Sequence, residues 1–284
     1  MDTLEDLVQL IHAESERLTH SLHTLSPESW HRPSACALWE IRDVVGHLTW
    51  LAEFFVDIIS RGVHGDASVP AGRPPGDAPT TGSFNAYIAQ RAIARRESLG
   101  AQLLPTCSAG YAALSRLLAG LTPPDWNKPC AFWPSVGTVP VRTLLVQIMQ
   151  ELVIHGWDIR SRLATAAPLP PESLPVLMDR IPARLRGSGY RDFRLDAGLP
   201  TPVRYRFVLT GAVPSAHDLL VENGKVRMEP AGTASPHVTF RCETERFVLL
   251  MYRRLTLEPM MAAGQLVVEG DRGLTTAFDQ WLRA

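Results

Sequence analysis

Glu151 and His155 are two metal-ligand residues four positions apart in an apolar segment that runs from Val141 to Arg160. At about 100° per residue in a helix, His155 falls within the apolar stripe and Glu151 lies at its edge. A second helical segment, Trp39 to Trp50, carries His47 at the margin of its own stripe. Two imidazoles and one carboxylate would leave a fourth position open, as in catalytic metal sites. The spacing alone also fits a hydrogen-bonded Glu/His pair and a boundary histidine.

Helical periodicity extends from the N-terminus to about Leu163 and predicts the elements that position these residues. Two apolar stripes begin at Leu4 and Ile41, and a segment rich in Pro and Gly, Gly62 to Gly82, predicts a long loop. A third helical region should run from about Phe84 to Leu121, with a break or kink at Pro105. With the segment that holds Glu151, the pattern predicts a four-helix bundle, whose facing helices are a common place for metal sites.

The period changes to that of strands after a Pro-rich segment, Ala164 to Pro171, and a helix at about 172–186. Asn223-Gly224 predicts a hairpin turn. The expected strands are 203–209, 218–222, 225–228 and 236–241, and two helices should follow at 243–254 and 273–282. We therefore expect an α+β protein with a helical domain at 1–165 and a smaller antiparallel α/β domain at 166–284.

Composition and charge fit a cytoplasmic enzyme that acts on small molecules, as a monomer or small homo-oligomer. The chain has 284 residues, 45% of them hydrophobic, and a net charge of -1, which gives no electrostatic case for nucleic acid or an anionic membrane. No apolar run approaches the roughly 20 residues that a membrane span needs. Four cysteines, Cys36, Cys107, Cys130 and Cys242, lack metal or redox spacing and suit a reducing compartment. None is expected to be a nucleophile.

Three segments resemble the mycothiol-dependent maleylpyruvate isomerase family of the DinB-like superfamily. They are Leu25 to Trp30, then Cys36 with Trp39 to Leu48, and Glu151 to Asp158. The resemblance implies a divalent metal, usually zinc, bound by His47, Glu151 and His155. The C-terminal half, from about Val203 to Asp271, is similar to sterol carrier proteins. The family often has a hydroxyl residue after the Trp, and Glu40 stands there, so the capping box is expected to be lost.

Two acidic residues could support the ligands. Asp43, one turn before His47, could accept a hydrogen bond from that ring, although an acidic residue in the first turn of a helix is explained by the helix dipole. Asp158, one turn after His155, could either orient the site or bind Arg142, Arg160 or solvent.

The set of three metal ligands suggests a reaction, because a cation with a free coordination position can bind a thiol and deprotonate it. The family resemblance implies that mycothiol supplies the thiol, which would add to an activated double bond, so the expected activity is that of an isomerase or S-transferase with a metal-bound thiolate as nucleophile. A thiol-independent metal enzyme of secondary metabolism and a non-catalytic carrier of small molecules or lipids remain alternatives.

An acidic substrate would need a cationic anchor. The second domain offers Arg253 and Arg254 at the end of a predicted helix, and either could clamp a carboxylate. Compensation of the helix dipole on a solvated surface is the alternative role for this pair.

Overall fold

The computed structural model describes residues 3–37, 39–70, 81–132, 137–163, 168–185, 202–222 and 225–283. The chain divides into two compact units, Met1–Pro168 and Leu169–Ala284. The boundary expected at 165/166 falls within 164–167, outside the described residues. Among the described residues, no helix has the length and apolar character needed to cross a membrane.

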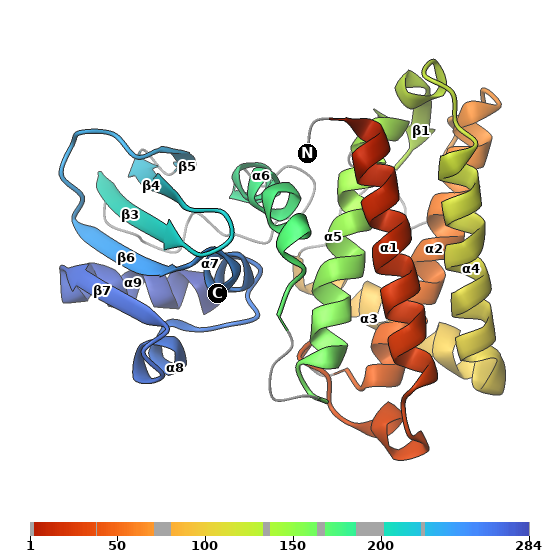
Figure 1. The fold of residues 1–284 in the computed structure, drawn as a ribbon, viewed down its shortest axis with the longest axis horizontal. Coiled ribbons are helices and arrows are strands. Elements are labelled where there is room, and N and C mark those ends of the chain that lie inside the picture. Colours follow the sequence, from red (N-terminus) through yellow and green to blue (C-terminus); the bar gives the residue numbers. More distant parts are fainter. Residues whose placement is uncertain are drawn as a thin grey trace. The chain divides into compact units, whose positions relative to one another are not determined.

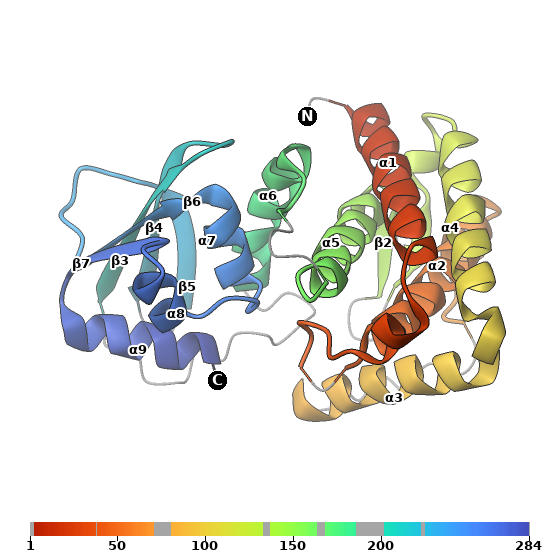
Figure 2. The same ribbon diagram turned by 60° about the horizontal axis from the view of Figure 1, so that its bottom comes forward.

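The first unit is built on four long helices, α1 (Leu4–His23), α2 (Ile41–Val63), α4 (Leu103–Ala119) and α5 (Val141–Arg160). Helix α1 packs against α4 and α5, and α2 packs against the same two helices, so the four close around a shared core (Figure 1). Helix α3 (Thr81–Leu99) lies outside this set, against α2 (Figure 2). Short 3-10 turns at Pro27–His31, Gly100–Gln102 and Asp125–Asn127 complete the helical part.

The break in the third helical region falls at Gly100, not at Pro105 as predicted. Gly100 has φ +51°, a left-handed conformation that ends a helix and favours glycine. Pro105 lies in the first turn of α4, where its missing N–H has no intrahelical acceptor, so the helix continues through it undisturbed. Before α5, two three-residue strands, β1 (Pro129–Ala131) and β2 (Thr138–Pro140), pair antiparallel. The sequence pattern did not predict them.

Gly46 permits α3 to approach α2 directly beside His47. A Cβ atom built at Gly46 would lie 2.5 Å from the carbonyl oxygen of Ala92 and 3.0 Å from the Cβ of Arg96. Arg96 also donates to Asp43 at 2.9 Å, and Arg95 forms an ion pair with Glu53. The α2–α3 contact therefore depends on the absence of a side chain at Gly46 and on two arginine–carboxylate pairs.

The second unit is one five-stranded sheet with helices. Its elements are α6 (Leu174–Leu185), β3 (Val203–Thr210), β4 (Ser215–Glu222), β5 (Lys225–Pro230), β6 (Val238–Glu243), α7 (Thr244–Met251), α8 (Leu257–Ala262), β7 (Leu266–Gly270) and α9 (Arg272–Arg283), with a 3-10 turn at Pro171–Ser173. The strand order is β5-β4-β3-β6-β7. Three pairs are antiparallel as expected, whereas β3 and β6 are parallel, so the sheet is mixed.

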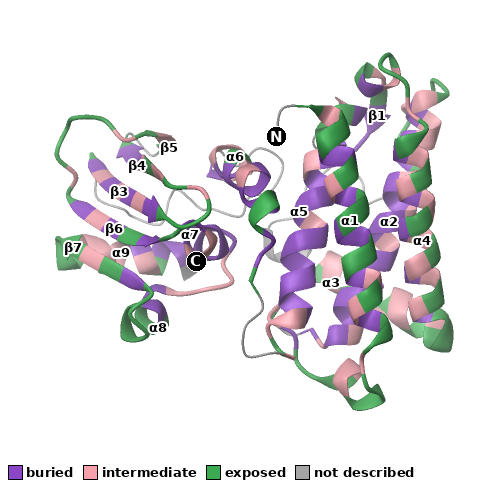
Figure 3. Cartoon of the chain, in the orientation of Figure 1, coloured by how far each residue is buried: buried purple, intermediate pink, exposed green. Residues whose placement is uncertain are grey.

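Alternating burial along β3 separates the two faces of this sheet (Figure 3). On the buried face, Phe207 packs on Phe247 of α7, and Tyr205 and Phe240 pack on Phe278 of α9. The hairpin predicted at Asn223-Gly224 joins β4 and β5, which pair as far as Glu222 with Lys225, but the two turn residues lie outside the described residues.

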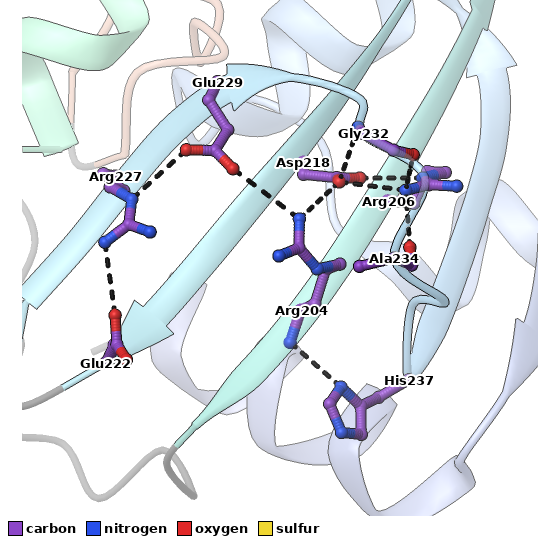
Figure 4. A network of polar contacts seen from close by, with 9 residues as sticks. All are labelled: Arg204, Arg206, Asp218, Glu222, Arg227, Glu229, Gly232, Ala234 and His237. Atoms are coloured by element: carbon purple, nitrogen blue, oxygen red, sulfur yellow. Dashed lines mark hydrogen bonds and ion pairs between the residues drawn. The ribbon is translucent and has the colours of Figure 1, made fainter.

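The opposite face carries a network of charges centred on Asp218, whose side chain is fully buried (Figure 4). Arg204 Nη1 donates to Oδ2 of Asp218 at 2.6 Å, Arg206 Nε donates to Oδ1 at 2.7 Å, and the N–H of Gly232 donates to Oδ2 at 3.2 Å. Burial alone would raise the pKa of Asp218, but these donors lower it to about 2. The network stabilises the β3–β4 pair and the segment that follows β5.

Candidate metal centre

Helices α2 and α5 place His47, Glu151 and His155 around one point. Nε2 of His47 lies 3.3 Å from Oε2 of Glu151, and Nε2 of His155 lies 3.2 Å from the same oxygen. The two imidazole rings meet edge to face, with centroids 4.8 Å apart. One ligand atom from each residue lies within 4.8 Å of the others. The three residues that the spacing singled out are therefore neighbours in the bundle interior.

His155 has a second partner on the far side of its ring. Its Nδ1 lies 2.9 Å from Oδ2 of Asp158, whose side chain is fully buried. Of the alternatives for Asp158, the structure therefore favours orienting His155. Burial opposes protonation of His155, but the hydrogen bonds with Asp158 and Glu151 outweigh it and raise the pKa of His155 to about 9.

His47 lacks such a partner. Its side chain is 7% exposed, and its Nδ1 has no hydrogen-bond partner among the described residues. Asp43 does not fill this role, because its Oδ1 accepts from Arg96 and its Oδ2 accepts from the N–H of Glu40. Glu40 and Asp43 form a capping box at the start of α2, so the expectation that this box is lost was wrong. Burial lowers the pKa of His47 more than its hydrogen bond with Glu151 raises it.

Glu151 is held as an anion. Gln147, one turn earlier on α5, donates its amide N–H to Oε1 at 2.6 Å, which leaves Oε2 facing both imidazoles. Burial raises the pKa of Glu151, but the hydrogen bonds from His155 and His47 outweigh it and the net shift is downward. The sequence pattern missed Gln147, although its position four residues before Glu151 was a usable signal.

Aromatic rings cover the histidines. Trp39, from the turn that precedes α2, lies 5.1 Å from the His47 ring and stacks on His155 at 6.0 Å between centroids. Trp50 lies 6.2 Å from His47 and stacks on Phe54. Phe132 extends this aromatic set to the end of β1, whereas Trp133 lies outside the described residues. Such rings exclude water from the imidazoles.

A cysteine also lies beside the site, although the spacing of the four cysteines along the sequence does not indicate a metal site. Sγ of Cys36 lies within 4.8 Å of ligand atoms of both His155 and Asp158. The turn that carries Cys36 is fastened to α5, because the N–H of Ala35 donates to the carbonyl of Asp158 at 2.9 Å. The other three cysteines are buried.

The two arginines proposed as anchors lie at the end of α7 in the second unit. Arg253 has φ +59°, an unusual left-handed conformation for a residue other than glycine. Arg254 Nη1 donates to the carbonyl of Tyr252 at 3.0 Å, which agrees with stabilisation of the helix C-terminus. Their role as carboxylate anchors stays a prediction.

Comparisons with known proteins agree with this architecture. Residues 11–160 match the mycothiol maleylpyruvate isomerase N-terminal domain, and residues 203–283 match the SCP-2 sterol transfer family. A crystal structure of the mycothiol-dependent maleylpyruvate isomerase is 15% identical and has a TM-score of 0.63, over 94% of this chain and 93% of that one. A mutant of that enzyme gives the same TM-score of 0.63 at 14% identity, with the same coverage of 94% and 93%.

No protein of curated function matches the sequence significantly. The match to the isomerase N-terminal domain nevertheless spans more than half of the 284 residues. This chain belongs to the mycothiol maleylpyruvate isomerase N-terminal domain family.

Proposed function

We propose that the protein is a metal- and thiol-dependent enzyme that acts on an electrophilic small molecule as an isomerase or S-transferase. The observation that carries the proposal is the convergence of two imidazoles and one carboxylate on a single point in the bundle. Membership of the isomerase family supports the choice of reaction.

The residues fit a divalent cation, and zinc suits them best. Nε2 of His47, Nε2 of His155 and Oε2 of Glu151 are the atoms that would hold it, because they already face one another. Imidazole nitrogen and carboxylate oxygen bind zinc at about 2.0 to 2.2 Å, and three protein ligands leave a position for a further group. When bound, the cation would favour the thiolate form of a mycothiol-type cosubstrate at neutral pH.

The surrounding side chains prepare the ligands. Asp158 accepts a hydrogen bond from Nδ1–H of His155, which keeps the lone pair on Nε2. Gln147 fixes the other carboxylate oxygen of Glu151, so that Oε2 is the one presented. Trp39 shields both imidazoles from water, which strengthens the electrostatic interactions of the site.

An isomerase would use the thiolate reversibly. Sulfur adds to one carbon of an electron-poor double bond, the remaining single bond rotates, and elimination of the thiolate restores the double bond in the other geometry. An S-transferase would stop after addition or would displace a leaving group. Maleylpyruvate, the substrate in the name of the similar enzyme, is the first compound to assay.

The test is turnover of maleylpyruvate by zinc-loaded protein with and without mycothiol. We expect activity that requires both, and its loss in a His155→Ala variant that has lost its metal but keeps its helical circular dichroism. His20→Ala, an exposed histidine of α1, is the matched control and should leave activity unchanged. Full metal occupancy of His155→Ala would refute the ligand assignment.

The role of the thiol is tested separately in cobalt-substituted protein that carries Cys36→Ser. Adding mycothiol should produce a sulfur-to-cobalt charge-transfer band, and the substitution ensures that the sulfur is not that of Cys36. Undiminished turnover without thiol would favour a thiol-independent metal enzyme. Absence of metal together with retained ligand binding would favour a carrier.

A further inference from the structure

Cys36, His155 and Asp158 form a second group of potential ligands, on the opposite side of the His155 ring from Glu151. One ligand atom of each lies within 4.8 Å of the other two. Nδ1 of His155 is already 2.9 Å from Oδ2 of Asp158, whereas Nε2 of the same ring faces Glu151. We assign Nδ1 of His155 to the second group and Nε2 to the first, because Asp158 lies at Nδ1 and Glu151 lies at Nε2.

The backbone holds the thiol in this place. Ser34 Oγ accepts from the N–H of Cys36 at 3.1 Å and donates to the carbonyl of Trp39 at 2.8 Å, which closes the turn. The N–H of Ala35 then ties the turn to the carbonyl of Asp158. Cys36 is only partly buried, so a cation could reach it from solvent.

We propose that Cys36, Nδ1 of His155 and Asp158 form an alternative cation site for thiophilic divalent ions such as Zn²⁺ and Cd²⁺. Thiolate, imidazole and carboxylate are all zinc ligands, with bonds of about 2.3, 2.0 and 2.1 Å. Around a tetrahedral ion such bonds put ligand atoms roughly 3.5 Å apart. The distances from Cys36 therefore need to shorten by about 1.3 Å at most, and the 2.9 Å contact between His155 and Asp158 needs to lengthen by about 0.6 Å, both by side-chain rotation.

The two groups compete for one ring. A neutral imidazole has one lone pair, so a cation on Nε2 leaves the proton on Nδ1 and a cation on Nδ1 leaves it on Nε2. Occupation of the second group also replaces the His155–Asp158 hydrogen bond that orients the first. A thiophilic ion at Cys36 would therefore weaken metal binding by His47, Glu151 and His155, and would inhibit an enzyme that depends on it.

Cadmium is the probe, because cadmium–thiolate bonds absorb in the ultraviolet and need no added thiol. The first group is disabled by His47→Ala. In that variant, Cd²⁺ should give a sulfur-to-cadmium band that saturates at one equivalent. The band should be lost when Cys36→Ser is added, and kept when Cys242→Ser, a buried cysteine of the second unit, is added instead.

A second background separates this site from a rearranged first group in which Cys36 replaces His47. In Glu151→Gln the proposal expects the band to form, because Glu151 is not one of its ligands and the glutamine carbonyl can still accept from Nε2–H of His155. Failure of the band to form in His47→Ala, its survival after Cys36→Ser, or its loss in Glu151→Gln would each overturn the proposal. If the double variant loses its helical circular dichroism, cadmium NMR of His47→Ala decides, since a resonance without sulfur coordination would also overturn it.

Discussion

Replacing Asp158 by asparagine changes one atom of the site and leaves its shape intact. Oδ2 of Asp158 lies 2.9 Å from Nδ1 of His155, and the side chain is fully buried. The carboxylate can only accept at this position, so it fixes the proton on Nδ1 and the lone pair on Nε2. An asparagine can turn its NH₂ towards Nδ1 instead, which favours the tautomer that cannot bind a cation through Nε2.

The expected loss of zinc affinity follows from the hydrogen bond between Asp158 and His155. Loss of a carboxylate that orients a metal-binding histidine costs about 10- to 100-fold in metal affinity. This corresponds to about 1.4 to 2.8 kcal/mol, in the range of one hydrogen bond to a charged group. Asp158→Asn should therefore bind zinc about 10- to 100-fold more weakly than the wild type, as measured by competition with a chromophoric chelator.

Asp57→Asn is the matched control, because Asp57 is half-exposed on α2 and its partner Arg61 lies 3.8 Å away. It should leave zinc affinity unchanged. Both variants should keep their helical circular dichroism, since the carbonyl of Asp158 that binds Ala35 is retained. Wild-type zinc affinity in Asp158→Asn would refute the role given to this carboxylate.

Five further predictions concern protonation, packing, the second unit and the division between the two units. Because the metal-free pKa of His155 is about 9, above its ordinary 6.5, zinc binding near pH 7 should release about one proton, measured by calorimetry in buffers of different ionisation enthalpy. Because the pKa of His155 is raised in the folded state, its proton should stabilise the metal-free protein fully below pH 6.5, and this stabilisation should be lost as the pH rises through about 9. A urea unfolding midpoint that does not change between pH 6.5 and 9 would contradict this prediction. Gly46→Ala should destabilise by about 1 to 2 kcal/mol in urea unfolding, since overpacking against the Ala92 carbonyl outweighs the gain in helix propensity, whereas Gly110→Ala, with a methyl neighbour at 3.2 Å, should be near neutral. Arg253→Gly should stabilise by about 1 kcal/mol by removing a side chain from a left-handed position, and should lower activity only if Arg253 anchors the substrate. Limited proteolysis should cut first between 64 and 80 or between 164 and 171, where Pro and Gly are concentrated, and a first cut inside β3 or β4 would argue against the division near 165.

Helical periodicity was sufficient to bring Glu151 and His155 together. An i, i+4 pair on one face is fixed by local geometry, so Glu151 and His155 had to be neighbours once α5 formed. His47 was harder to place, because it lies at the margin of its stripe. In the structure its side chain faces Glu151 and His155 of α5 and lies beside the Trp39 ring, contacts that the pattern of α2 alone does not contain.

Two features that sequence reasoning missed depend on distant partners. Cys36 lies in a turn whose position is set by a hydrogen bond from Ala35 to α5. The parallel pairing of β3 with β6 depends on which edge of β3 remains available after β4 has paired with the other. Strands β1 and β2 have three residues each, too few for a period to be detected.

The charges of the site argue for a divalent ion. Glu151 and Asp158 contribute two negative charges, and the imidazoles of His47 and His155 are neutral when they bind a metal. In the metal-free protein a proton on His155 offsets only one of these charges. Burying an uncompensated charge is unfavourable, so a cation of charge +2 is expected, because it neutralises both carboxylates where the proton neutralises only one. The second ligand group also contains His155 and a carboxylate, that of Asp158. It adds the soft sulfur of Cys36, which explains why this group should prefer a strongly thiophilic ion.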